Sequence, residues 1–226
     1  MMGIYFIAII FMLIGWAVQM RLRSKFKEYS EIPLAAGLTG REVAEKMLRA
    51  HSITNVKVIS VEGQLTDHYN PLAKTLNLSY DVYNGNNAAS AAVAAHECGH
   101  AVQHAEAYAW LQVRSALVPV VSVTSRVVQW VLLAGILLIN TFPNLLLAGI
   151  IMFAAVTLFA FITLPVEFDA SRRGLEWLES SGIASSIEHE RAKDALWWAA
   201  MTYVVAAIAT LTTLLYYIMI FMRRRD

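Results

Sequence analysis

Four long apolar segments dominate the hydrophobic pattern of this chain. They are 3–20, 117–140, 145–164 and 196–222. Each is close to the roughly 20 residues that a helix needs to cross the hydrocarbon core of a bilayer. The pattern therefore predicts a single integral-membrane domain over 1–226, with extramembrane parts at 21–116 and 165–195.

The flanks of these segments predict how the chain is threaded. The first segment lacks a basic n-region and a small-residue cleavage site, which indicates an uncleaved anchor with its N-terminus outside. The short link 140–144 joins the second and third segments into a helical hairpin. Arg126 and Gln129 interrupt the second segment, whose first half is expected to be covered by protein or to lie shallow. Pro165 closes the third segment, and a new helix is expected to follow it.

The polar stretch after the first segment is predicted to fold as helix, strands and helix. A capping-box spacing at Thr39 and Glu42 indicates a helix that ends near Ser52. Alternating residues at 56–61 and 75–83 predict two strands that pair as a β-hairpin. The edge of this hairpin either binds an extended peptide or simply supports the next helix.

Composition and charge narrow the class of protein. Hydrophobic residues make up 58% of the 226 residues, which is too many for one soluble domain of this size. The net charge is +1 and no basic stretch is interleaved with aromatics, so we expect no nucleic-acid partner. Cys98 is the only cysteine, which excludes an intrachain disulfide.

The distribution of basic residues predicts the orientation in the membrane. With four spans, the two polar stretches share one side and Arg223–Arg225 lie on the other. The basic residues near span ends on the shared side outnumber those three arginines, which places the polar stretches in the cytoplasm. They are Arg21, Arg23, Lys25, Lys27, Arg114, Arg172, Arg173, Arg191 and Lys193.

Residues 96–100, with the order His-Glu-Cys-Gly-His, carry the clearest chemical signal. On a helix, His96 and His100 lie one turn apart on one face and can direct ring nitrogens to one zinc ion. The Glu97 carboxylate can reach a metal-bound water, where a general base for hydrolysis must lie. The alternative is a surface helix that carries these residues by chance.

The context of this motif favours a metal site. The lead-in 86–95 offers an Asn N-cap and then small helix formers with almost no polar face, which indicates a buried helix. Two buried histidines and a glutamate need a partner, and a metal ion satisfies all three. Gly99 in mid-helix predicts the close approach of another backbone or of a further ligand. Cys98 is expected to face away from both histidines as a small buried side chain.

A catalytic zinc usually has three protein ligands and an open position, so a ligand outside the motif is required. His104 lies about 12 Å beyond His96 along a helix, too far to share one ion. Glu167 follows the third apolar segment on a predicted face of small residues, and we favour it as the ligand. Asp169 is then a partner that orients a histidine. The alternative is that both acids are interfacial and pair with the arginines at 172–173.

The combined motifs resemble the YugP-like membrane zinc metallopeptidases of bacteria. The resemblance rests on the N-terminal anchor, residues 91–105 around the motif, the membrane hairpin and residues 167–171. Residues 67–69 are similar to an upstream signature of that family. The resemblance implies a multi-pass protein of the bacterial inner membrane, with peptide or membrane-protein substrates.

More distantly, the chain is similar to the HtpX and CAAX prenyl protease gluzincins. That similarity implies His96, His100 and Glu167 as ligands of one zinc ion, and Glu97 as the base. In that group an aspartate follows the glutamate by four positions, where this chain has Ser171. The role of Asp169 and the substrate therefore stay open.

The sequence predicts a mainly α membrane protein of about four transmembrane helices, with a small α+β zincin-like unit formed by a helix, a β-hairpin and the HExxH helix. The expected activity is peptide-bond hydrolysis by a zinc-activated water. Its rivals are a non-catalytic zinc-stabilised scaffold and a small transporter component that uses Arg126 and Gln129. The candidates for stabilising the oxyanion are His68, Tyr69, Tyr108 and Arg172. A plain turn explains the neighbouring Asn70 and Pro71 without any function.

Overall fold

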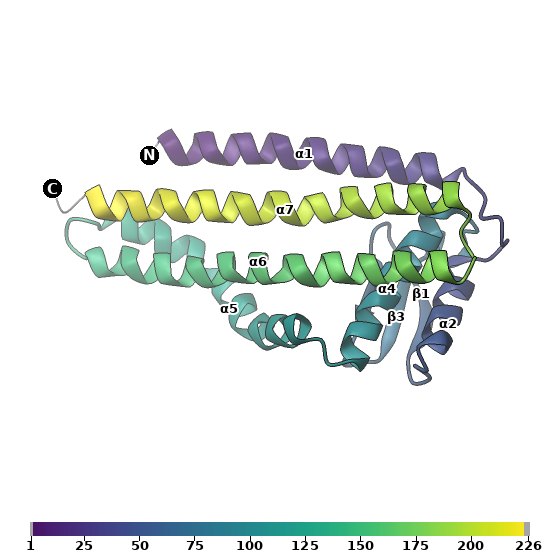
Figure 1. Ribbon diagram of the computed structural model, residues 1–226. Coiled ribbons are helices and arrows are strands. Elements are labelled where there is room, and N and C mark those ends of the chain that lie inside the picture. Colours follow the sequence, from purple (N-terminus) through teal and green to yellow (C-terminus); the bar gives the residue numbers. More distant parts are fainter. Residues whose placement is uncertain (1, 224–226) are drawn as a thin grey trace. The chain divides into compact units, whose positions relative to one another are not determined.

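The computed structural model describes residues 2–223 and is mainly α-helical (Figure 1). Its helices and strands are α1 (Met2–Ser30), α2 (Gly40–Ala50), β1 (Lys57–Val61), β2 (His68–Asn70), β3 (Thr75–Ser79), α3 (Tyr80–Asn84), α4 (Ala88–Ala105), α5 (Ala109–Leu137), α6 (Pro143–Ser180) and α7 (Ser186–Arg223). Within the described residues, α1, α5, α6 and α7 are long and apolar enough to cross a membrane. This confirms the predicted fold class, a mainly α-helical membrane protein with a small α+β part.

The described residues fall into two compact units, and each long helix contributes to both. One unit contains the described parts of 1–17, 112–164 and 202–226. The other contains 18–111 and 165–201, and therefore holds the strands, α2 to α4 and the predicted metal ligands. The single-domain assignment over 1–226 stays a prediction. Arg224 and Arg225, which entered the orientation argument, lie outside the described residues.

In the first unit, α5 and α6 pack as the predicted hairpin. Gly135 lies so close to Leu146 that a Cβ at this position would stand 2.6 Å from the Leu146 Cα. Leu132 and Leu146 are buried in the small core between these helices. Arg126 and Gln129 are exposed on α5 rather than covered by the described chain, so protein does not shield the polar part of this segment.

In the second unit, α2, α4 and the sheet share one hydrophobic core. The predicted capping box begins α2: the Thr39 amide donates to the Glu42 carboxylate at 2.8 Å, and the Glu42 amide donates to the Thr39 hydroxyl at 3.3 Å. Asn87 caps α4 by accepting from the Ser90 amide at 2.9 Å. Within the lead-in 86–95, residues 88–95 are all buried, as their composition predicts, whereas Asn86 is exposed and Asn87 is partly buried.

The strand pairing predicted from the sequence is wrong. β1 pairs with β3 in parallel, and the antiparallel partner of β3 is β2, which gives the order β1-β3-β2. The direction of β1 differs because residues 62–74 do not form a tight turn but supply β2, which takes the antiparallel position beside β3.

The second predicted strand is also shorter than expected. β3 ends at Ser79, because the Asp67 carboxylate accepts hydrogen bonds from the Ser79 amide at 2.7 Å and from the Ser79 hydroxyl at 3.1 Å. The chain then turns into α3 instead of continuing as a strand to Tyr83.

The predicted break at Pro165 does not occur, because α6 runs through the proline as one helix. A proline costs a helix one backbone hydrogen bond. The turns of α6 that follow Pro165 pack closely on α4, and this packing offsets the cost. A Cβ at Gly174 of α6 would lie 2.8 Å from the carbonyl carbon of Ala95 in α4, and Gly99 of α4 faces the carbonyl of Ala170 in α6. The small-residue face predicted for this part of the chain is confirmed, and it brings α6 against α4.

Candidate metal centre

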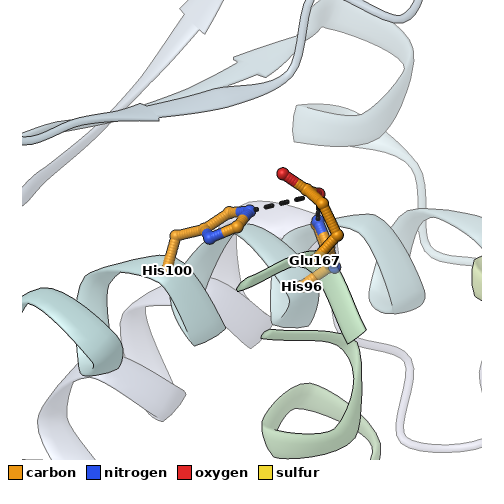
Figure 2. Close-up of side chains that lie close together, drawn as sticks. All are labelled: His96, His100 and Glu167. Carbon is orange, nitrogen blue, oxygen red and sulfur yellow. Dashed lines mark ion pairs between the residues drawn. The ribbon is translucent and has the colours of Figure 1, made fainter. Parts of the chain in front are cut away.

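Two histidines and a glutamate converge between α4 and α6. The Glu167 Oε2 atom lies 3.4 Å from His96 Nε2 and 3.6 Å from His100 Nε2. The three potential ligand atoms all lie within 4.8 Å of one another. Figure 2 shows the Glu167 carboxylate facing both imidazole rings. Glu167 and His100 are buried, and His96 is partly buried.

Local structure explains this convergence. One helical turn separates His96 from His100, so their rings meet on one face of α4 with centroids 4.8 Å apart. The close packing at Gly99 and Gly174 then holds α6 near enough for Glu167 to reach both rings.

We expect Gly99→Ala to destabilise the protein by about 1–3 kcal/mol, because the added methyl would overlap the Ala170 carbonyl and push α6 from α4. The same step should weaken metal binding by moving Glu167. Thermal unfolding in detergent measures the first effect and competition with a chelator the second. Gly15→Ala is the matched control, since nothing lies within 4 Å of a Cβ there. Equal stability and equal metal affinity in the two variants would contradict the prediction.

The second nitrogen of each imidazole is also hydrogen-bonded. His96 Nδ1 lies 3.0 Å from the Ser171 hydroxyl, and His100 Nδ1 lies 3.0 Å from the Gln103 Oε1 atom. The Nε2 atoms are thereby left to face Glu167. Sequence reasoning did not give Ser171 or Gln103 a site role, although Ser171 occupies the position four residues after Glu167 where the distant gluzincins have an aspartate.

The donor set fits a zinc ion. Two imidazole nitrogens and one carboxylate oxygen form a common ligand set of catalytic zinc, and hydrogen bonds to the outer ring nitrogens are typical of zinc-binding histidines. Unprotonated Nε2 atoms would oppose the lone pairs of the Glu167 carboxylate, so this arrangement favours a cation between them. Burial alone would lower the pKa of His100, but the hydrogen bond to Glu167 and the charges of Glu167 and Glu97 outweigh it and raise this pKa.

The Glu97 side chain is buried beside the ligand group but makes a different contact. Its Oε2 atom accepts a hydrogen bond of 2.9 Å from the backbone amide of Tyr69 in β2. Asp67 precedes this strand and is hydrogen-bonded to Ser79. Its carboxyl also interacts electrostatically with the charge of Glu97. Burial chiefly, with the repulsion from Glu97, raises the pKa of the Asp67 carboxyl. β2 therefore fixes the orientation of the Glu97 carboxylate.

The other candidate residues make contacts of their own. The His68 side chain is exposed, with Nδ1 2.8 Å from the Thr66 carbonyl oxygen. The Tyr69 hydroxyl lies 2.8 Å from Nδ1 of the exposed His104. Tyr69 is thus joined to Glu97 by its backbone and to His104 by its side chain. His104 lies outside the ligand group, as its helical distance from His96 predicts.

Tyr108, which lies between α4 and α5, and Arg172 of α6 make separate contacts outside the ligand group. The Arg173 guanidinium carbon lies 5.7 Å from the centre of the Tyr108 ring. Arg172 pairs with Asp169 and Glu176. The pairing of Asp169 with both arginines, weighed as an alternative from the sequence, is observed, but Glu167 does not share it and faces the histidines.

Fold and site together define a mainly α-helical membrane protein with a two-histidine, one-carboxylate centre on helices of its α+β unit. The chain belongs to the family described as "Putative neutral zinc metallopeptidase", which it matches over residues 4–222. It is 41% identical over 211 residues to a protein of Bacillus subtilis (strain 168) named "Putative membrane protease YugP", with 93% of this chain and 92% of the relative covered. No solved structure matches the chain. The family resemblance drawn from the sequence motifs is confirmed.

Proposed function

We propose that this protein is a membrane-bound zinc metalloendopeptidase of the gluzincin type, with one zinc ion held by His96, His100 and Glu167. The observation that carries the proposal is the approach of two Nε2 atoms and one carboxylate oxygen to within 4.8 Å, at a buried position. The family supports zinc as the metal and peptide hydrolysis as the reaction, and the relative named as a membrane protease supports the same activity.

Glu97 is the proposed general base. When bound, zinc supplies Lewis-acid polarisation of the scissile carbonyl and a lowered pKa for the attacking water. Glu97 accepts one proton from that water as the new carbon–oxygen bond forms, and returns it to the leaving amine as the carbon–nitrogen bond breaks. The Tyr69 amide holds one Glu97 oxygen, which leaves the other oxygen to carry the proton.

The proposed substrate is an extended peptide or a loosely structured segment of a membrane protein. β2 lies at one edge of the sheet, and its Tyr69 amide already touches Glu97, so a peptide that follows this edge would reach the base. Among the oxyanion candidates, Tyr69 is supported best because its backbone amide contacts Glu97. The excess of basic residues beside the span ends supports an active site on the cytoplasmic side of the bacterial inner membrane.

The test is metal analysis of the full chain purified in detergent, combined with cleavage of an unfolded membrane-protein substrate. We expect one zinc per chain, loss of cleavage on chelation and its return with added zinc. His96→Ala should lose both zinc and cleavage, whereas His51→Ala, at an exposed residue, should keep both.

The two rivals predict different results. A zinc-stabilised scaffold would bind zinc and lose stability on chelation, yet cleave nothing. A transporter component would give metal-independent flux in vesicles. Cleavage that survives complete removal of zinc would overturn the proposal.

A further inference from the structure

The two histidines of the metal centre are oriented by partners of different kinds. The Ser171 hydroxyl beside His96 can donate or accept a hydrogen bond, so it is compatible with either neutral tautomer of that ring. His100 Nδ1 faces an amide oxygen, which can only accept. A hydrogen bond to this oxygen requires a proton on His100 Nδ1, and this places the free lone pair of the neutral ring on Nε2.

The orientation of the Gln103 amide is fixed by its other contacts. Its Nε2 atom donates to the Val166 carbonyl oxygen at 2.8 Å and to Asp169 Oδ2 at 2.9 Å. Both partners are acceptors, because Asp169 is also paired with Arg173, whose Nε lies 2.6 Å from the same oxygen. A flipped amide would place its oxygen against these two acceptors and its NH₂ group against His100, so the network selects one orientation.

Burial gives this network its strength. The Gln103 side chain is fully buried, so water does not compete for its hydrogen bonds. Arg173 is held in turn by Glu106 at 2.6 Å, and Glu106 follows the last residue of α4. The contacts therefore connect the end of α4 with Arg173 and Asp169 of α6, and continue through Gln103 to the proposed ligand His100.

We infer that Gln103 is a positioning residue that keeps the proton of His100 on Nδ1 and so presents Nε2 to the metal. Asp169 affects His100 indirectly, because it orients the Gln103 amide. The inference about metal affinity rests on the proposed zinc site, but the position of the proton does not.

The proton position is measured by ¹⁵N NMR of labelled histidine in the metal-free Glu167→Ala protein at alkaline pH. This substitution removes the carboxylate that would draw a proton to Nε2. We expect His100 to carry its proton on Nδ1 in this protein, and to shift toward the Nε2–H form, which histidine favours in water, when Gln103→Met is added. Methionine keeps the approximate volume of glutamine but cannot accept this bond. A proton on Nε2 in both proteins, or on Nδ1 in both, would overturn the inference.

Zinc affinity gives an independent second measurement. Loss of an outer partner of a zinc-binding histidine weakens metal affinity by about 10–100-fold, so Gln103→Met should show this decrease in a chelator competition. Gln64→Met, at an exposed loop residue, is the matched control and should bind zinc as the unmodified chain does. Unchanged affinity in Gln103→Met would contradict the positioning role. An unmodified chain that binds no zinc would instead refute the proposed function and leave the NMR result intact.

Discussion

Glu97→Gln is expected to lower peptide hydrolysis by about 10²–10⁴-fold while zinc stays bound. Glu97 is not one of the three residues whose ligand atoms converge, so its loss should leave the metal in place. Glutamine has the same shape, and its amide oxygen can still accept the hydrogen bond from the Tyr69 amide. The substitution therefore removes the ability to take and return a proton and preserves the local packing.

The measurement is the rate of cleavage under saturating zinc, together with the zinc content of the same sample. Glu62→Gln, at an exposed residue, makes the same chemical change away from the site and should leave the rate unchanged. If Glu97→Gln cleaves at the full rate with one zinc bound, another group is the base.

The helical parts of the site could be predicted from sequence because their signals are local. His96 and His100 are four residues apart, and the period of a helix places them on one face whatever surrounds it. Gly99 carried a packing signal, since a glycine in mid-helix is costly unless another backbone comes close, and here it meets Ala170. Glu167 could be proposed because an acid beside a small-residue helix face is unusual after an apolar span.

Features that depend on contacts between residues distant in sequence could not be predicted from local sequence patterns. The direction of β1 relative to β3 depends on how residues 62–74 cross between them, and alternation of polar and apolar residues does not encode this. The continuity of α6 at Pro165 depends on packing against α4, which outweighs a local rule. Ser171 and Gln103 are neutral side chains that become informative only when a histidine nitrogen is seen 3.0 Å away.

Glu167→Ala should decrease zinc affinity more than Gln103→Met does. Loss of a residue that only hydrogen-bonds a zinc-binding histidine, such as Gln103, is expected to weaken affinity by about 10–100-fold. The substitution removes an anionic ligand and leaves two imidazole nitrogens, which cannot balance the charge of the ion in a buried site. Zinc retained after dialysis and competition with a chelator measure the change. Glu179→Ala removes an exposed carboxylate from the same helix and should leave affinity unchanged.

This experiment also separates the two interpretations of the acids on α6. If Glu167 were an interfacial acid, its removal would leave zinc in place. In the structure its carboxylate faces His96 and His100, whereas Asp169 is the acid that pairs with the arginines. The geometry therefore predicts unequal effects from two acids only two residues apart: Glu167→Ala should empty the site, and Asp169→Ala should weaken it only as far as the Gln103 amide loses its orientation. Equal effects would mean that the carboxylates act as one electrostatic cluster and that neither is a ligand by itself.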